Sequence, residues 1–99
     1  MILKWRKLPV VVETVKWVGN NEAEIIKFCL PRKAYLGSKE TNPKGIVNKA
    51  TMIIETLEGN HEAKLWDIII KGVEGECYPC DEAIFDKTYE IVEELDDKA

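Results

Sequence analysis

The stretch that decides the fold is Asp67-Ile-Ile-Ile-Lys-Gly-Val-Glu-Gly-Glu-Cys-Tyr-Pro-Cys80, and Asp81-Glu-Ala-Ile-Phe-Asp-Lys-Thr-Tyr-Glu90 follows it directly. Its three isoleucines predict a strand over residues 68–73, because a short apolar run bounded by turn residues is typical of a buried strand. The segment from Gly72 to Gly75 predicts a tight turn into a second, short strand. The stretch is therefore expected to fold as one hairpin.

The residues after this hairpin predict a helix and a further strand. Pro79 has no backbone N–H and is expected to stop strand pairing. Asp81 is placed to cap a short helix over about residues 81–87. Residues 89–92 have the composition of a last strand.

The N-terminal part of the chain predicts a strand and the main helix. Residues 9–18 are rich in β-branched side chains, with Val11, Val15 and Trp17 expected on one face. A helix is expected over about residues 21–30, where Asn21 and Glu24 have the spacing of a capping box and Pro31 ends the element. Its apolar stripe is expected to consist of Ile25, Ile26, Cys29 and Leu30.

The middle of the chain predicts a long loop and then more strands. Glycine, proline, serine and asparagine interrupt any periodicity over residues 31–50, so we expect a flexible loop there with at most a brief extended piece at residues 34–36. Strands are expected over residues 51–57 and 62–65, each ended by a turn signal. The connections are too short for parallel crossovers, so antiparallel pairing is expected.

The elements together predict an α+β fold. We expect a single domain over residues 1–99, because 99 residues is the usual size of one domain. Its sheet is expected to be mostly antiparallel and curled toward a partial barrel, with the main helix packed against one face.

Composition and charge limit the classes of function. The chain is 45% hydrophobic and 32% charged with a net charge of −4, and no apolar run is long enough to cross a membrane. We therefore expect a soluble, cytoplasmic protein with no membrane partner. The charge is uneven: residues 31–50 hold five basic side chains against one acidic one, whereas residues 94–99 are expected to form a frayed acidic tail.

Three parts of the sequence resemble one known family. They are Arg6-Lys7-Leu8-Pro9-Val10-Val11-Val12-Glu13 with Trp17, Glu55-Thr56-Leu57-Glu58-Gly59, and the Ile69-Ile70-Lys71-Gly72-Val73-Glu74-Gly75-Glu76 run with Tyr78-Pro79-Cys80, Ile84-Phe85 and Thr88-Tyr89-Glu90. The chain resembles a family of small proteins encoded by phages and prophages of bacteria. That family usually has Pro-Gly-Asp before the Ile-Ile-Lys-Gly strand, where this chain has Leu65-Trp66-Asp67. Trp66 thus replaces a glycine that adopts positive φ cheaply, so this turn is expected to differ or to be strained.

The resemblance implies a function without catalysis. It implies a non-enzymatic accessory binding protein, acting in the host cytoplasm, that inhibits a host protein such as a component of antiviral defence. The identity of that host protein does not follow from the sequence. A homodimer is an open alternative, because an edge strand in a small sheet often pairs with its own copy.

The cysteines and the single histidine offer thiol or metal chemistry as alternatives. Cys77-Tyr78-Pro79-Cys80 has the Cys-x-x-Cys spacing of redox proteins, and a zinc site would recruit Cys29 and His61 as well. Against both, only nineteen residues follow Cys80, and the ligand spacings match no zinc finger. We therefore expect packed, reduced thiols, no catalytic residue, no metal and no cofactor. Carboxylates such as Glu55 and Asp67 are expected on a solvated face.

The candidate binding residues lie in the basic loop and at one turn. Basic side chains interleaved with an aromatic one suit phosphates or an acidic protein face. An exposed tryptophan at a turn suits a protein contact. The candidates for binding a partner or an anionic ligand are Arg32, Lys33, Tyr35, Lys39, Lys44 and Trp66. The alternative to host-protein binding is a protein that sequesters a nucleotide or another phosphate ligand through this loop.

Overall fold

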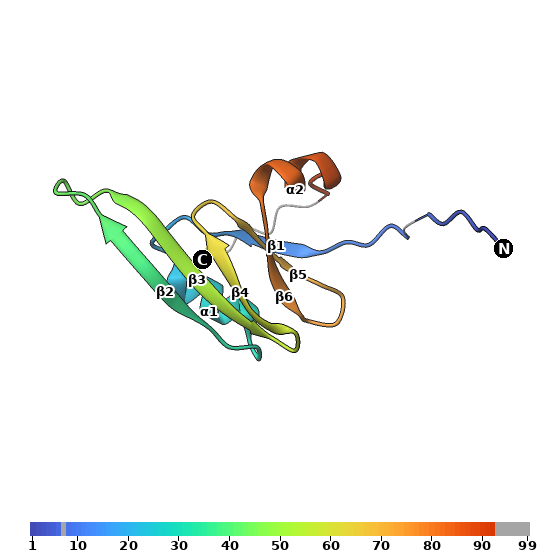
Figure 1. Ribbon diagram of the computed structural model, residues 1–99, viewed down its shortest axis with the longest axis horizontal. Helices are drawn as coiled ribbons and strands as arrows, with labels where there is room; N and C mark the ends of the chain where they lie inside the picture. The colour runs from blue at the N-terminus through green and yellow to red at the C-terminus, as the bar shows by residue number, and fades with distance from the viewer. Residues whose placement is uncertain (7, 93–99) are drawn as a thin grey trace.

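The computed structural model describes residues 1–6 and 8–92 and has six strands and two helices in that part of the chain (Figure 1). They are β1 (Glu13–Lys16), α1 (Glu22–Cys29), β2 (Ala34–Thr41), β3 (Val47–Thr56), β4 (Gly59–Lys64), β5 (Ile68–Lys71), β6 (Cys77–Cys80) and α2 (Glu82–Thr88). The strands form two antiparallel three-stranded sheets, with the orders β1-β5-β6 and β2-β3-β4. The predicted α+β class, the single small domain and the antiparallel pairing are confirmed, and the expected curled sheet is divided into these two.

The core lies between the two sheets and α1. Trp17, directly after β1, is fully buried, and its indole N–H donates a 3.0 Å hydrogen bond to the carbonyl oxygen of Ala50 in β3. Other members of the core come from both sheets and from the inner side of the helix; they are Ile25, Cys29, Met52, Ile54, Ile69 and Cys77. The helix therefore packs through Ile25 and Cys29.

The sheet β1-β5-β6 is covered on both faces. Ile69 belongs to the main core, whereas Ile68 and Ile70, which point to the other face, are also buried. On that face Tyr78 of β6 hydrogen-bonds Tyr89, whose ring stacks on Phe85 of α2 with 4.6 Å between the ring centroids. In Figure 1, α2 lies above this sheet, away from α1. This double coverage explains why the isoleucine run is apolar at every position.

The segment predicted to be a flexible loop forms a β-hairpin instead. β2 pairs with β3 along its whole length, and Asn42 closes the turn by accepting hydrogen bonds from the backbone N–H groups of Lys44 and Ile46. Gly37 and Ser38, which the sequence presents as loop residues, form a β-bulge where the pairing register shifts. The N–H and hydroxyl of Ser38 both reach Thr51 Oγ1, at 2.9 and 3.0 Å. A bulge absorbs strand-breaking residues without ending the strand.

The first strand and the main helix are shorter than predicted. β5 ends at Lys71, opposite Glu13, so residues 9–12 have no partner strand and Val11 is 75% exposed although it was expected to face the core. Asn21 begins α1 without donating or accepting a capping bond to the helix backbone, because its side chain bonds Lys16, Val18 and Glu24 instead. Ile26 and Leu30 are exposed, so the expected four-residue stripe reduces to two buried positions.

Two predictions at the C-terminal end were wrong. Pro79 lies inside β6, opposite Ile69, because β6 is an edge strand and a missing N–H can face outward there. Residues 89–92 form no strand, because Tyr89 remains bonded to α2 through its N–H and Phe85 O. The cap by Asp81 is confirmed, since its carboxylate accepts from the N–H of Ile84. The predicted acidic tail at residues 94–99 lies outside the described residues.

The helices of the described residues are short. None of them combines the length and the apolar character that crossing a membrane would need.

Candidate binding site around Trp66

Trp66 occupies a strained position between the two sheets. It lies in the three-residue connection from β4 to β5, and its φ of 77° is the one positive value among the non-glycine residues that the structure describes. This left-handed conformation destabilises a bulky L-residue by about 1 to 2 kcal/mol. The expectation of a strained turn at Leu65-Trp66-Asp67 is thus confirmed, and something must hold the turn in place.

Backbone hydrogen bonds on both sides hold Trp66. Its N–H donates to the carbonyl oxygen of Trp17 at 2.8 Å, and the N–H of Trp17 donates back to Asp67 O at 2.9 Å. These bonds extend the pairing of β1 and β5 by one step. Since Trp17 is a fully buried core residue, the backbone of Trp66 is fixed to the core while its side chain remains 52% exposed.

Asp67 closes the turn from the other side. Its carboxylate Oδ2 accepts from the N–H of Lys64 at 2.9 Å, and its own N–H donates to Lys64 O at 3.0 Å. Asp67 is only 6% exposed, so the expectation that it lies on a solvated face was wrong. A buried carboxylate is tolerated here because a backbone donor satisfies it.

Lys16 and Glu82 join the tryptophan to α2. The ammonium group of Lys16 lies 5.6 Å from the centroid of the Trp66 ring, which is within the range of a cation–π interaction. The same ammonium group forms an ion pair with the carboxylate of Glu82, in the first turn of α2. Neither residue was singled out from the sequence, because they are distant from Trp66 along the chain.

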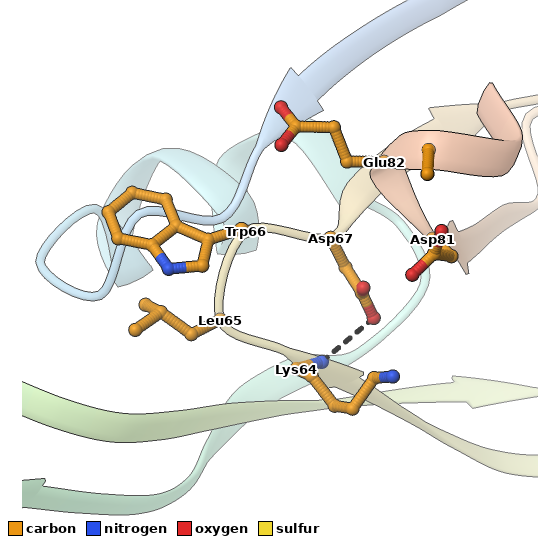
Figure 2. Close-up of a pocket in the computed structure, with 7 residues that line it drawn as sticks. Lys64, Leu65, Trp66, Asp67, Asp81 and Glu82 are labelled. Carbon is orange, nitrogen blue, oxygen red and sulfur yellow. Dashed lines mark hydrogen bonds between the residues drawn. The ribbon is translucent and has the colours of Figure 1, made fainter. Parts of the chain in front are cut away.

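A solvent-open cavity of about 370 Å³ lies beside these groups. It is lined by Lys64, Leu65, Trp66, Asp67, Asp81, Glu82 and Ala83. Figure 2 shows the side chains of Trp66 and Leu65 on one side of the connection and the carboxylate of Asp67 directed at the backbone nitrogen of Lys64. The lining holds three carboxylates and Lys64, and Lys16 pairs with one of those carboxylates, so three negative charges against two positive ones leave a net charge of −1 around the exposed ring. This charge favours a cationic group in the cavity.

The other five predicted site residues lie on the β2-β3 hairpin and do not meet at this cavity. Lys33 precedes β2 and lies 5.8 Å from the ring centroid of Tyr35, whereas Lys44 lies in the turn at the far end. Eight strand residues separate these two ends, which corresponds to about 26 Å. Neither described cavity is lined by Arg32, Lys33, Tyr35, Lys39 or Lys44.

The bulge at Gly37 further divides the basic side chains. Before it, Tyr35 pairs with Ile53 and Leu36 with Met52; after it, Lys39 pairs with Ala50. Because Met52 and Ala50 point to the same face of β3, Lys39 shares the face of Leu36 and not that of Tyr35. Lys33 and Lys39 therefore point to opposite faces of the hairpin, an arrangement that suits an extended partner better than a single phosphate group.

The cysteines do not form the dithiol that the Cys-x-x-Cys spacing suggested. Cys77 and Cys80 are three residues apart on an extended strand, about 10 Å, which is too far for a disulfide. Cys77 instead hydrogen-bonds Cys29 of α1, and both thiols are fully buried. That bond and burial raise the pKa of Cys29, and the same bond lowers the pKa of Cys77.

The residues of the hypothetical zinc site are also apart. His61 is exposed in β4, whereas Cys29 and Cys77 are buried in the core, and the Cys80 thiol donates to the carbonyl oxygen of Asp81 at 3.5 Å. Across residues 1–6 and 8–92, the structure groups no three histidine, cysteine or acidic side chains closely enough to hold a metal ion.

Comparison with known proteins gives no identification: no protein-family model, no curated protein and no solved structure matches this chain.

Proposed function

We propose that this protein is a non-enzymatic binding protein whose Trp66 anchors a protein partner. The observation that carries the proposal is a half-exposed tryptophan held at positive φ by hydrogen bonds to a core residue. Backbone strain of this kind persists only where the surroundings impose it, and it concentrates at functional sites. Tryptophan is also the residue type most enriched among the energetic anchors of protein interfaces.

The chemistry of the site specifies the partner further. Trp66 offers an apolar ring, and Asp67, Asp81 and Glu82 give the adjoining cavity its negative charge. We expect the partner to place an arginine or lysine in this cavity, with its aliphatic stem against the ring. Such binding weakens as salt is added, because the cavity is open to solvent.

The biological setting of the proposal rests on the resemblance to the phage and prophage family. With that resemblance, the partner is a host protein, and the protein acts by blocking it, as an inhibitor of a component of antiviral defence would. The spread of the basic side chains along the hairpin supports a protein partner over a sequestered nucleotide.

Affinity capture with matched variants tests the proposal. Wild type, Trp66→Ala and Leu57→Ala are immobilised and exposed to a host lysate, and bound proteins are identified by mass spectrometry. Leu57 is the control because it is 87% exposed and lies in the β3-β4 turn, outside the cavity. We expect a protein that wild type and Leu57→Ala retain and Trp66→Ala loses.

Reconstitution with the purified partner completes the test. Loss of an anchor tryptophan is expected to weaken the affinity by a factor of about 30 or more. Undiminished binding by Trp66→Ala contradicts the proposal. A thermal shift produced by nucleotides, suppressed when Lys33 and Lys39 are replaced by alanine, would favour the phosphate-binding alternative.

A further inference from the structure

Two cysteines from different elements meet in the core. Cys29 is the last residue of α1 and Cys77 is the first residue of β6, and both are free thiols. The two thiols hydrogen-bond each other, and the exposed fractions of the two residues are 0% and 1%. Because they are far apart in the sequence, only the packing of the helix against the sheet brings their sulfur atoms into contact.

A lysine ammonium group lies close to this thiol pair. Lys71 of β5 is the register partner of Cys77, and its ammonium group lies 4.7 Å from the ring centroid of Phe28, the neighbour of Cys29 in α1. The hydrogen bond from Cys29 lowers the pKa of Cys77 and the charge of Lys71 lowers it further, whereas burial and the Glu76 carboxylate oppose both. Cys77 therefore ionises before Cys29, and a thiolate is the form of cysteine that oxidants attack.

Both cysteines lie at the ends of their elements, where the backbone can adjust. Two hydrogen-bonded sulfur atoms must still approach each other to reach the disulfide bond length of about 2.05 Å. Leu30, the residue after Cys29, is exposed, and so is Val73 in the turn that leads into β6. Small shifts at these two ends disturb little of the packed core, so the pair can close without unfolding of the domain.

We propose that Cys29 and Cys77 form a peroxide-responsive thiol pair, which hydrogen peroxide converts into a disulfide that joins α1 to β6. The Cys77 thiolate attacks one oxygen atom of the peroxide, the O–O bond breaks, and a sulfenic acid forms. The hydroxide released takes up the proton that Cys77 lost and leaves as water. The Cys29 sulfur then attacks Cys77 Sγ, the S–O bond breaks, and the departing hydroxide takes the Cys29 proton. Two thiols and one peroxide molecule thus give one disulfide and two water molecules.

The thiol pair lies apart from the candidate binding site. Cys77 is opposite Lys71, the last residue of β5, whereas Trp66 lies before Ile68, the first residue of that strand. The length of β5 is about 13 Å. The disulfide is therefore expected to leave the Trp66 cavity open and to act on stability, because a bond between α1 and β6 restricts the unfolded chain over the long segment between the two cysteines.

Peroxide treatment of the folded full-length chain tests the proposal. The background is Cys80→Ser, because Cys80 is less buried than the other two cysteines. The peroxide concentration is one that oxidises the same chain completely when it is unfolded in urea. After alkylation under denaturing conditions, mass spectrometry is expected to show the loss of two hydrogen atoms, no alkylated thiol, and one crosslinked peptide that contains Cys29 and Cys77. Two alkylated thiols, or a disulfide between two chains, would overturn the proposal.

Urea denaturation shows whether the crosslink fits the native fold. The oxidised chain is expected to unfold at a midpoint higher by about 1 M urea or more, and dithiothreitol is expected to restore the midpoint of the reduced chain. Cys29→Ala/Cys80→Ser and Cys77→Ala/Cys80→Ser are the matched controls, and peroxide should not raise their midpoints. A crosslinked chain whose midpoint is unchanged or lower would mean that the native positions of α1 and β6 do not accommodate the disulfide, which contradicts the proposal.

Discussion

The indole N–H of Trp17 donates to the carbonyl oxygen of Ala50 at 3.0 Å, and this buried hydrogen bond joins the β1-β5-β6 sheet to the β2-β3-β4 sheet. The backbone of the same residue also holds Trp66 and Asp67. Trp17 thus connects the core to the candidate binding site. A substitution at Trp17 should therefore change both the stability of the core and the conformation of the turn at Trp66.

Replacing Trp17 by phenylalanine is expected to destabilise the fold. The change removes the indole donor and leaves Ala50 O buried without its partner, which costs about 1 to 3 kcal/mol of the free energy of unfolding. Urea denaturation followed by circular dichroism measures this loss. Trp5→Phe is the control, because Trp5 is 86% exposed and its ring is kept aromatic. Equal midpoints for the two variants would show that the Trp17 bond contributes nothing.

The conformation of Trp66 is tested by comparing two truncations. Trp66→Ala and Trp66→Gly both remove the ring, but only glycine adopts a φ of 77° without a steric penalty. After allowance for the greater freedom of glycine in the unfolded chain, we expect Trp66→Gly to be the more stable by about 1 kcal/mol. Thermal denaturation of both variants decides the matter, and a more stable alanine variant would mean that the turn is unstrained in solution.

Gly37 is expected to be required for the bulge. A Cβ at this position would lie 2.7 Å from Thr51 Oγ1 and 3.1 Å from Ile53 Cγ1, so Gly37→Ala forces β3 or the bulge to move. Overpacking of this kind costs about 1 to 3 kcal/mol.

A double-mutant cycle separates this clash from other effects of the substitution. In Gly37→Ala/Thr51→Ala the obstructing hydroxyl is gone, so the combined loss in unfolding free energy should be smaller than the sum of the two single losses. Strictly additive losses would place the cost of alanine elsewhere than at Thr51.

The buried thiol pair predicts a decline in stability at alkaline pH. The hydrogen bond to Cys77 and burial raise the pKa of Cys29 above its ordinary value of 9.0. Above that pH the unfolded chain loses the proton while the folded chain keeps it, so the free energy of unfolding falls as pH rises; the lowered pKa of Cys77 acts in the opposite direction.

Measuring unfolding midpoints against pH for wild type and Cys29→Ala tests this assignment. At a pH low enough for both Cys29 and Cys77 to stay protonated, the two curves should be parallel. Above the ordinary thiol pKa the wild-type curve should fall more steeply, because the variant has no thiol at this position. Parallel curves throughout would mean that Cys29 ionises as readily in the folded protein as in the unfolded chain.

Local patterns in the sequence determined most of the elements of this protein. The isoleucine run, the Gly72 to Gly75 turn and the Asp81 cap act between residues a few positions apart, and the structure forms each of them. Strain at the Leu65-Trp66-Asp67 turn was expected from the resemblance alone, and the structure has Trp66 at a φ of 77°. Such features depend on backbone sterics and neighbouring hydrogen bonds, which a short stretch of sequence contains.

Only the tertiary structure decided how distant residues meet. Gly37 and Ser38 look like loop residues in the sequence, and the bulge that keeps them in β2 exists because Thr51 of β3 bonds Ser38. Lys16 and Glu82 approach Trp66 from elements far apart in the chain. Contacts of this kind depend on packing between elements, so neither the division into two sheets nor the cavity beside Trp66 can be derived from any one segment.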